Sequence, residues 1–232
     1  MSGARDQILG ALRRSLKVSD EDGARRQAVE ARLAKPERVI VPERSQGSPA
    51  DLTALFKSMA EQVQTTIDEV ASLDEVPGAV AGYLKARNLP PQVKITPAAD
   101  LKGLDWADQK LLETAFGRAQ GDDPVSVTRA LAGVAETGTL AVISGEEGAT
   151  TLNFLPETNI VVLRRDEIVG PYEEVWDRLR QRFGKDVMPR TLNFITGPSR
   201  TGDIEQTILL GAHGPKRLHV ILVGEDAPAG SA

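Results

Sequence analysis

The spacing of apolar residues in the second half of the chain predicts strands and helices in alternation. Three apolar runs predict strands: NIVVLRR at 159–165, RTLNFIT at 190–196 and KRLHVILVG at 216–224. Between the first two, PYEEVWDRLRQRFG at 171–184 predicts a helix, with a proline at its start and a glycine at its end. Strands and helices that alternate at this pitch favour βαβ units, so we expect an α/β fold with a largely parallel sheet flanked by helices.

The same alternation begins at Ser48. Ser48 and Pro49 are residue types expected at an N-cap and at a first helical position. From there to residue 144 the pattern predicts helices at 48–63, 73–88 and 126–138, and strands at 65–71, 91–97 and 139–144. We therefore expect one α/β domain over residues 49–223.

The first 48 residues have a different pattern, and we interpret 1–48 as an N-terminal helical arm and linker. Apolar residues recur at helical spacing within 4–17, and 20–34 predicts a second, thinly apolar helix. The stretch KPERVIVPERSQGSPA at 35–50 contains three prolines and a glycine, which predicts an extended linker. The arm could pack on its own domain or reach a neighbouring subunit, and both stay open. At the other end, 224–232 is predicted to be a disordered tail.

Composition and charge argue against several classes of protein. Of 232 residues, 41% are hydrophobic and 26% are charged, which is typical of a globular protein. The formal net charge of −5 argues against general nucleic-acid binding, because that requires clustered positive charge. No apolar run approaches the roughly 18–20 residues that span a bilayer, and the N-terminus lacks the apolar segment of a signal peptide. We therefore expect a cytoplasmic protein without a membrane span.

The absence of cysteine limits the chemistry further. Without thiols this chain forms no disulfide, has no thiol nucleophile and holds no iron–sulfur cluster through thiolates. Its two histidines, His213 and His219, are too few for a conventional multi-histidine zinc site, so we predict no metal site. The sequence also lacks the Walker phosphate loop, the G-x-G-x-x-G fingerprint and the G-x-S-x-G elbow.

The segment GPSRTGDIE at 197–205 is the strongest local indication of a binding site. Arg200 can hold a carboxylate or phosphate through paired hydrogen bonds, and Ser199 and Thr201 add hydroxyl groups. Thr201 or Asp203 also fits the cap of a helix, and a capped helix N-terminus itself attracts anions. The segment follows a predicted strand, and ligands of α/β sheets bind at the carboxyl ends of strands. An anion site and a polar turn that begins a helix are both compatible with these residues.

Two further loops carry candidate acid–base groups. In AETGT at 135–139 the carboxylate of Glu136 could project into a cleft, or it could be solvated at a helix end formed by Gly138. In GAHGPK at 211–216, His213 could act as an acid or base near neutral pH, or it could hydrogen-bond the backbone of a turn. We interpret His219, which lies inside a predicted strand, as structural.

Taken together, AETGT, LPETNIVVL, ITGPSRTGDIE and GAHGPKRLHVILV, with ARDQILGALRRSL near the N-terminus, resemble the lactate-utilization protein C family. The module that this family shares is called the LUD domain, and the resemblance covers most of the chain. The sequence departs from the family at Gly202, where alanine is frequent, and at Asn159, where histidine is common. The resemblance implies a fold like that of the sugar-phosphate isomerase and CoA-transferase superfamily.

The resemblance also implies a function and a set of site residues. It implies a cytoplasmic role in the oxidation of L-lactate to pyruvate, alongside two partner proteins that carry iron–sulfur clusters, with no cofactor on this chain. By position it implies Glu136 and His213 as catalytic residues. The substrate-binding residues that it implies are Thr137, Gly138, Thr139, Ser199, Arg200, Thr201, Asp203, Gly211 and Gly214.

Three functions stay open at this point. The chain could be a subunit of a lactate-oxidising complex that binds a small anionic substrate. It could instead be a stand-alone enzyme of the same superfamily, acting on a phosphorylated or acyl-activated small molecule, with Glu136 as acid–base group or nucleophile. It could also be a non-catalytic assembly factor that docks through residues 1–48. The sequence leaves the oligomeric state open.

Overall fold

The computed structural model describes residues 3–19, 22–35, 40–184, 187–204 and 207–224. The chain divides into two compact units, residues 1–41 and 42–232. The predicted tail at 224–232 lies outside the described residues after Gly224.

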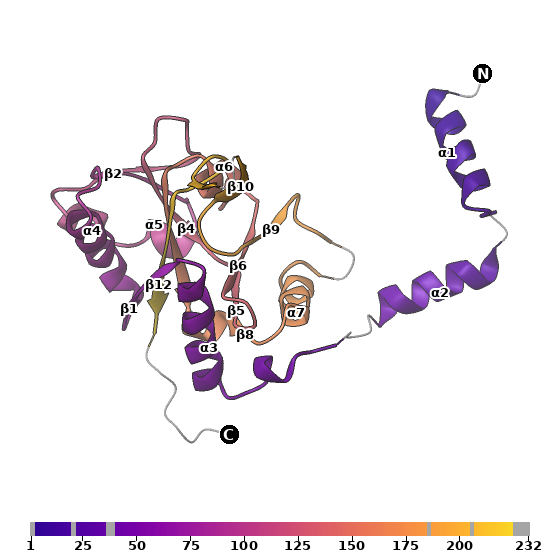
Figure 1. Ribbon diagram of the computed structural model, residues 1–232, viewed down its shortest axis with the longest axis horizontal. Coiled ribbons are helices and arrows are strands. Elements are labelled where there is room, and N and C mark those ends of the chain that lie inside the picture. The colour runs from indigo at the N-terminus through magenta and orange to yellow at the C-terminus, as the bar shows by residue number, and fades with distance from the viewer. Residues whose placement is uncertain (1–2, 20–21, 36–39, 185–186, 205–206, 225–232) are drawn as a thin grey trace. The chain divides into compact units, whose positions relative to one another are not determined.

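The first unit contains two helices, α1 (Ala4–Ser15) and α2 (Gly23–Ala34) (Figure 1). The Asp22 carboxylate caps α2 by accepting a hydrogen bond from the backbone N–H of Arg25 at 3.1 Å. Neither helix buries a residue, and the large apolar side chains of α1 are 37% to 61% exposed. The described residues of this unit therefore form no hydrophobic core.

The second unit is built on a six-stranded sheet in which every neighbouring pair of strands is parallel. In spatial order the strands are β1 (Thr66–Val70), β12 (Arg217–Val223), β7 (Thr158–Arg164), β4 (Val125–Arg129), β2 (Gln92–Ile95) and β3 (Glu113–Phe116). Parallel strands buried on both faces carry near-continuous apolar runs, as β7 and β12 do. The α/β fold with a largely parallel sheet flanked by helices is thus confirmed.

Alternate residues of the central strands pack against two different layers. On one face Ile160 and Val162 join a core with α4 (Val76–Ala86), α5 (Ala99–Lys102) and the 3-10 helix η3 (Trp106–Asp108). On the other face Val161 and Leu163 pack with Phe56 of α3 (Pro49–Gln62) and with a second sheet. Figure 1 shows α3 and α4 on opposite sides of the sheet. The period of two along each strand thus divides the core between two faces.

The second sheet has four strands and lies between the first sheet and helix α7 (Glu173–Phe183). Its spatial order is β8 (Ile168–Val169), β5 (Ala132–Val134), β6 (Thr139–Ile143) and β9 (Leu192–Ile195). A separate hairpin pairs β10 (Arg200–Ile204) with β11 (Thr207–Leu210). The remaining short elements are α6 (Thr150–Phe154) and the 3-10 helices η1 (Glu43–Ser45), η2 (Leu73–Glu75) and η4 (Arg165–Glu167).

Two helix predictions are wrong. The segment 126–138 forms β4 and β5, because successive residues from Val125 to Thr128 are all buried between two layers, which one helix face cannot achieve. The alternative in which the GPSR segment begins a helix is also wrong, since Arg200–Ile204 form the strand β10, which pairs with β11. The predicted helix at 48–63 is confirmed as α3, including its capping box between Ser48 and Asp51.

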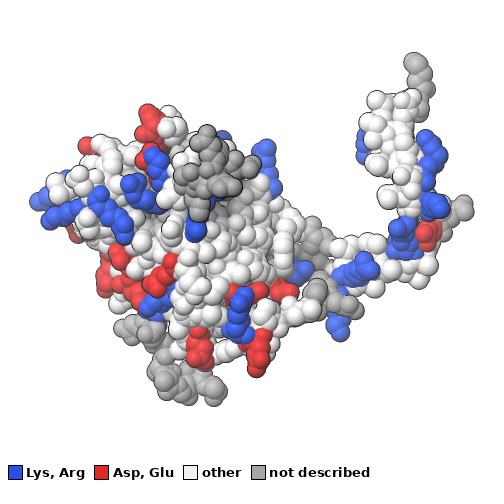
Figure 2. All heavy atoms as spheres, viewed as in Figure 1, with Lys and Arg blue, Asp and Glu red and all other residues white. Residues whose placement is uncertain are grey.

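Charged side chains of both signs lie side by side on the face of the second unit seen in Figure 2. In the described part of the chain, no helix has both the length and the apolar character needed to cross a bilayer.

Candidate functional site

The predicted AETGT loop forms the turn between β5 and β6 and packs against the end of α3. Gly138 has a positive φ of +64°, which glycine adopts without the strain felt by other residues. A Cβ atom at this position would lie 2.2 Å from the backbone nitrogen of Ala60. Only glycine therefore fits here, and this requirement fixes the turn against α3.

Four hydroxyl groups connect this turn to the end of β9. Thr139 lies 2.7 Å from Thr137, 2.7 Å from Thr196 and 2.9 Å from the Tyr172 hydroxyl, measured between oxygen atoms. Thr137 also lies 2.8 Å from Tyr172. Each hydroxyl can both donate and accept, so the four groups can satisfy one another and hold the two loops together.

The GPSR segment packs against the same end of α3. Gly197 has a φ of +73°, and a Cβ atom there would lie 2.5 Å from the carbonyl oxygen of Val63, the C-cap residue of α3. Arg200 donates a hydrogen bond from Nη2 to the same carbonyl oxygen. A cation is favourable at a helix C-terminus, where backbone carbonyls lack partners. The guanidinium has five N–H donors, so this bond leaves others available.

Ser199 connects this segment to the GAHGPK loop. Its backbone N–H donates to the Pro215 carbonyl at 2.9 Å, and its own carbonyl accepts from the N–H of Gly211 at 2.9 Å. A Cβ atom at Gly214 would lie 3.3 Å from Cβ of Ser199. The structure therefore brings together three loops that are far apart in sequence, which we call the three-loop cluster: residues 136–139, 196–201 and 211–215.

The two proposed catalytic side chains are not joined directly. Glu136 is half-buried, and its backbone N–H donates to the Gly170 carbonyl at 3.2 Å. His213 is exposed. No hydrogen bond or ion pair connects these two side chains in the part of the chain that the structure describes. Thr201 pairs with Leu209 in the β10–β11 ladder. The side chain of Asp203 lies outside the described part.

The position of the three-loop cluster differs from the expected one. The GPSR segment follows β9, which belongs to the four-stranded sheet, and the 211–215 loop precedes β12. The cluster thus lies at the amino end of β12, whereas ligands of parallel sheets bind at the carboxyl ends of strands.

His219 and Asn159 are core residues. His219 stacks on Tyr83 with ring centroids 3.9 Å apart, and its Nδ1 lies 2.8 Å from Oγ1 of Thr66. Its Nε2 is 3.5 Å from the Asp68 carboxylate without a hydrogen bond. Burial lowers the pKa of His219 to about 4, although Asp68 opposes this shift. Asn159 is fully buried and accepts a hydrogen bond from Thr128.

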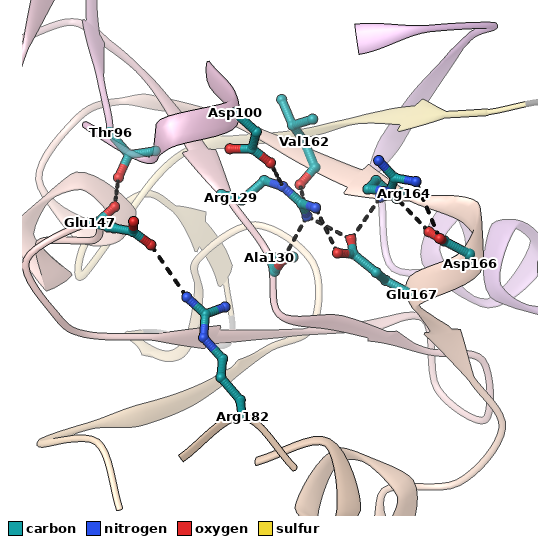
Figure 3. A network of polar contacts seen from close by, with 10 residues as sticks. All are labelled: Thr96, Asp100, Arg129, Ala130, Glu147, Val162, Arg164, Asp166, Glu167 and Arg182. Atoms are coloured by element: carbon teal, nitrogen blue, oxygen red, sulfur yellow. Dashed lines mark hydrogen bonds and ion pairs between the residues drawn. The ribbon is translucent and has the colours of Figure 1, made fainter. Parts of the chain in front are cut away.

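A second polar region, which the sequence did not predict, lies at the carboxyl edge of the parallel sheet. Figure 3 shows Arg129, the last residue of β4, between Asp100 and Glu167. Its guanidinium donates two bonds of 2.6 Å to Glu167 and one of 2.8 Å to Asp100. It also donates to the Ala130 carbonyl at 2.8 Å. Burial lowers the pKa of Arg129, but pairing with Glu167 and Asp100 raises it overall above the ordinary value.

A hollow of about 340 Å³ opens beside this network. Arg129, Leu131 and Ala98 contribute to its lining, together with Glu147 and Arg182, whose side chains form an ion pair of 3.3 Å (Figure 3). It lies where the strand order reverses, because β2 has β3 on one side and β4 on the other. Such switch points are common ligand sites in α/β sheets. One signal in the sequence points to this region, an arginine directly after the β-branched residues Val127 and Thr128, but the pattern of 126–138 predicts a helix.

No group of three or more histidine, aspartate or glutamate side chains in the described residues is arranged to hold a metal ion.

The comparisons with known proteins identify the family. A model of the LUD domain family matches residues 52–223. The chain belongs to the LUD domain family. Over 176 residues it is 33% identical to lactate utilization protein C of Bacillus subtilis strain 168, an alignment that covers 75% of this chain and 71% of that protein.

Other relatives align over shorter stretches. The chain is 31% identical over 127 residues to lactate utilization protein C of Geobacillus sp. strain WCH70, which covers 54% of this chain and 47% of that protein. The alignment thus spans about half of the length of this relative. A crystal structure of a DUF162 family protein from Deinococcus radiodurans has a similar fold, with a TM-score of 0.57 and 24% identity. It covers 77% of this chain and 100% of that one.

Proposed function

We propose that this chain is a subunit of a lactate-oxidising system and that it binds the carboxylate of its small anionic substrate at the three-loop cluster. Its membership of the LUD domain family and its relatives named lactate utilization protein C support a role in lactate utilization. The observation that carries the proposed site is the direct contact among the loops at 136–139, 196–201 and 211–215. We place the reaction in the cytoplasm.

The binding step uses donors that the cluster already positions. One N–H of Arg200 is held by the Val63 carbonyl, which orients the guanidinium while other N–H groups stay available for a carboxylate. Ser199 and Thr201 are its neighbours in the chain, and we assign their hydroxyls as further donors to the substrate. Arg200 is exposed, so an incoming substrate can reach it.

The chemical step removes two electrons and two protons from the 2-hydroxy acid to give the 2-oxo acid. We assign the hydroxyl proton to His213 or Glu136 as general base. The hydrogen on Cα and its electron pair would leave together as a hydride equivalent to a redox acceptor on a partner protein, and iron–sulfur clusters there would carry the electrons onward; this chain has no cysteine to hold such a cluster.

The test is lactate-dependent dye reduction by the reconstituted complex of this chain with its iron–sulfur partners. Arg200→Gln removes the charge and keeps a hydrogen-bonding side chain. Loss of a charged hydrogen bond of about 1.5–3 kcal/mol predicts a rise of roughly tenfold or more in KM for lactate. Arg180→Gln is the matched control, since Arg180 lies on α7 and pairs with Asp177.

Two results would overturn the proposal. The first is an unchanged KM in Arg200→Gln, provided that its melting temperature matches that of the wild type. The second is full activity of the iron–sulfur partners without this chain. Stabilisation of the wild type by a CoA ester but not by lactate would favour the stand-alone enzyme instead.

A further inference from the structure

A second hollow adjoins the one beside Arg129, since Ser144, Gly145 and Gly148 line both. It has a volume of about 550 Å³, which is within the range of small-molecule sites. Three segments line it: Arg118 after β3, residues 144–145 and 148–151 after β6, and residues 190–191 before β9. None of these residues belongs to the three-loop cluster, so this hollow is separate from the lactate site proposed above.

The charged side chains that line this hollow are two arginines, Arg118 and Arg190. Glu146 and Glu147, in the same turn, line the adjoining hollow instead, where Glu147 pairs with Arg182. Neither arginine forms an ion pair with another described residue, whereas Arg129, Arg164 and Arg182 each pair with a carboxylate. Two guanidinium groups without counter-charges on one concave surface favour an anion between them.

Hydroxyl groups supply further donors, and hydrogen bonds fix their positions. The backbone N–H of Thr191 donates to Oγ of Ser144 at 2.9 Å, and the N–H of Ser144 donates to the Thr191 carbonyl at 3.0 Å. The side-chain oxygens of Thr150 and Thr191 are 3.3 Å apart. Ser144 Oγ also donates to the Thr191 carbonyl at 3.5 Å, so Ser144 holds this segment in place while the hydroxyls of Thr150 and Thr191 are the donors that face a ligand.

A tight turn keeps the backbone close to this surface. The N–H of Gly145 donates to the Gly148 carbonyl at 3.0 Å, and the reverse bond is 3.2 Å. A Cβ atom at Gly148 would lie 3.0 Å from the Ile143 carbonyl oxygen, which is tighter than ordinary contact. Glycine at this position therefore lets the loop close while adding no side chain to the hollow.

We propose that this hollow binds the phosphate group of a small phosphorylated ligand. Two guanidinium groups together with the hydroxyls of Thr150 and Thr191 offer more charge and more donors than one carboxylate can accept, whereas a phosphate monoester offers three acceptor oxygens and up to two charges. The volume leaves room for an organic group beside the phosphate. Arg118 follows the carboxyl end of β3, on the edge where parallel sheets bind ligands.

The test is isothermal titration of the full chain at constant ionic strength with three probes: inorganic phosphate, glycerol 3-phosphate and lactate. We expect saturable binding of glycerol 3-phosphate. Arg118→Gln and Arg190→Gln should each weaken it by roughly tenfold or more, because each removes a charged hydrogen-bond donor. Arg180→Gln and Arg200→Gln should bind it as the wild type does.

The following results would contradict the proposed phosphate site. Absence of saturable binding of both phosphate probes would overturn it, as would wild-type affinity in Arg118→Gln and Arg190→Gln. Binding of lactate with equal affinity, lost in the same two variants, would replace a phosphate site with a carboxylate site. Because Arg200→Gln is measured in parallel, failure here is distinguishable from failure of the three-loop cluster.

Discussion

Replacing Arg129 tests whether the ion-pair network at the carboxyl edge of the sheet supports the fold. Arg129→Met keeps most of the apolar stem and removes the guanidinium. The Arg129 side chain is 15% exposed, and its partners Glu167 and Asp100 are 21% and 35% exposed. The substitution therefore leaves two carboxylates partly buried without a counter-charge.

The magnitude follows from this burial. Breaking a buried pair destabilises a protein by about 3–5 kcal/mol, and water screens part of the loss because both carboxylates are partly exposed. We therefore expect the free energy of unfolding to fall by about 3 kcal/mol. For a folded unit of this size that corresponds to a decrease of about 6–12 °C in melting temperature.

The assay is denaturant unfolding followed by tryptophan fluorescence, since both tryptophans, Trp106 and Trp176, lie in the second unit. Arg164→Met is the control, because its pair with Asp166 is 46% and 68% exposed and should contribute less than about 1 kcal/mol.

Two measurements would refute this reasoning. One is a loss smaller than about 1 kcal/mol in Arg129→Met, the range of an exposed pair. The other comes from the triple variant Arg129→Met, Glu167→Gln and Asp100→Asn, which removes the unpaired charges and should recover at least half of the loss. A triple variant no more stable than Arg129→Met would show that unpaired charge is not the cause.

Three further predictions concern stability. The pKa of His219 is lowered from 6.5 to about 4, so the folded state favours the neutral imidazole, and about 3 kcal/mol of stability present above pH 6.5 should be lost as the pH falls towards 4. His219→Gln should lose less stability over this range. If the free energy of unfolding depends on pH equally in both proteins, His219 is not the group responsible. Gly138→Ala should destabilise by more than about 2 kcal/mol in thermal unfolding, because of its positive φ and the Ala60 backbone, whereas Gly121→Ala, with open space around it, should change little. Ser48→Ala should lose about 1 kcal/mol in the same assay, since it removes the cap of α3, and an unchanged midpoint would show that the cap contributes nothing.

Local patterns predicted the elements whose own residues determine their structure. The strands at 159–165 and 216–224 are apolar on both faces, and α3 carries its N-cap and first-turn signals within four residues. The segment 126–138 was mispredicted because its alanines and single arginine suit a helix locally, while burial between two layers decides its structure. Intrinsic helix propensity predicts secondary structure poorly where tertiary packing determines which residues are buried.

The candidate site was likewise predicted only in part. The sequence identified the three loops by their glycines and polar residues, and the glycines at 138 and 197 are indeed required by close approach to α3. It did not predict that Arg200 contacts the end of α3, since Val63 is 137 positions away in the chain. The pairing of Arg129 with Glu167 and the hollow between Arg118 and Arg190 also depend on contacts between distant segments.

The most direct test of the central claim is to titrate the isotope-labelled chain with lactate and follow the backbone amide signals by NMR. We expect saturable shifts concentrated in residues 136–139, 196–201 and 211–215, and Arg200→Gln should weaken the affinity for lactate by roughly tenfold or more. Shifts centred instead on residues 144–151, or the same affinity in Arg200→Gln as in the wild type, would contradict the proposed carboxylate site.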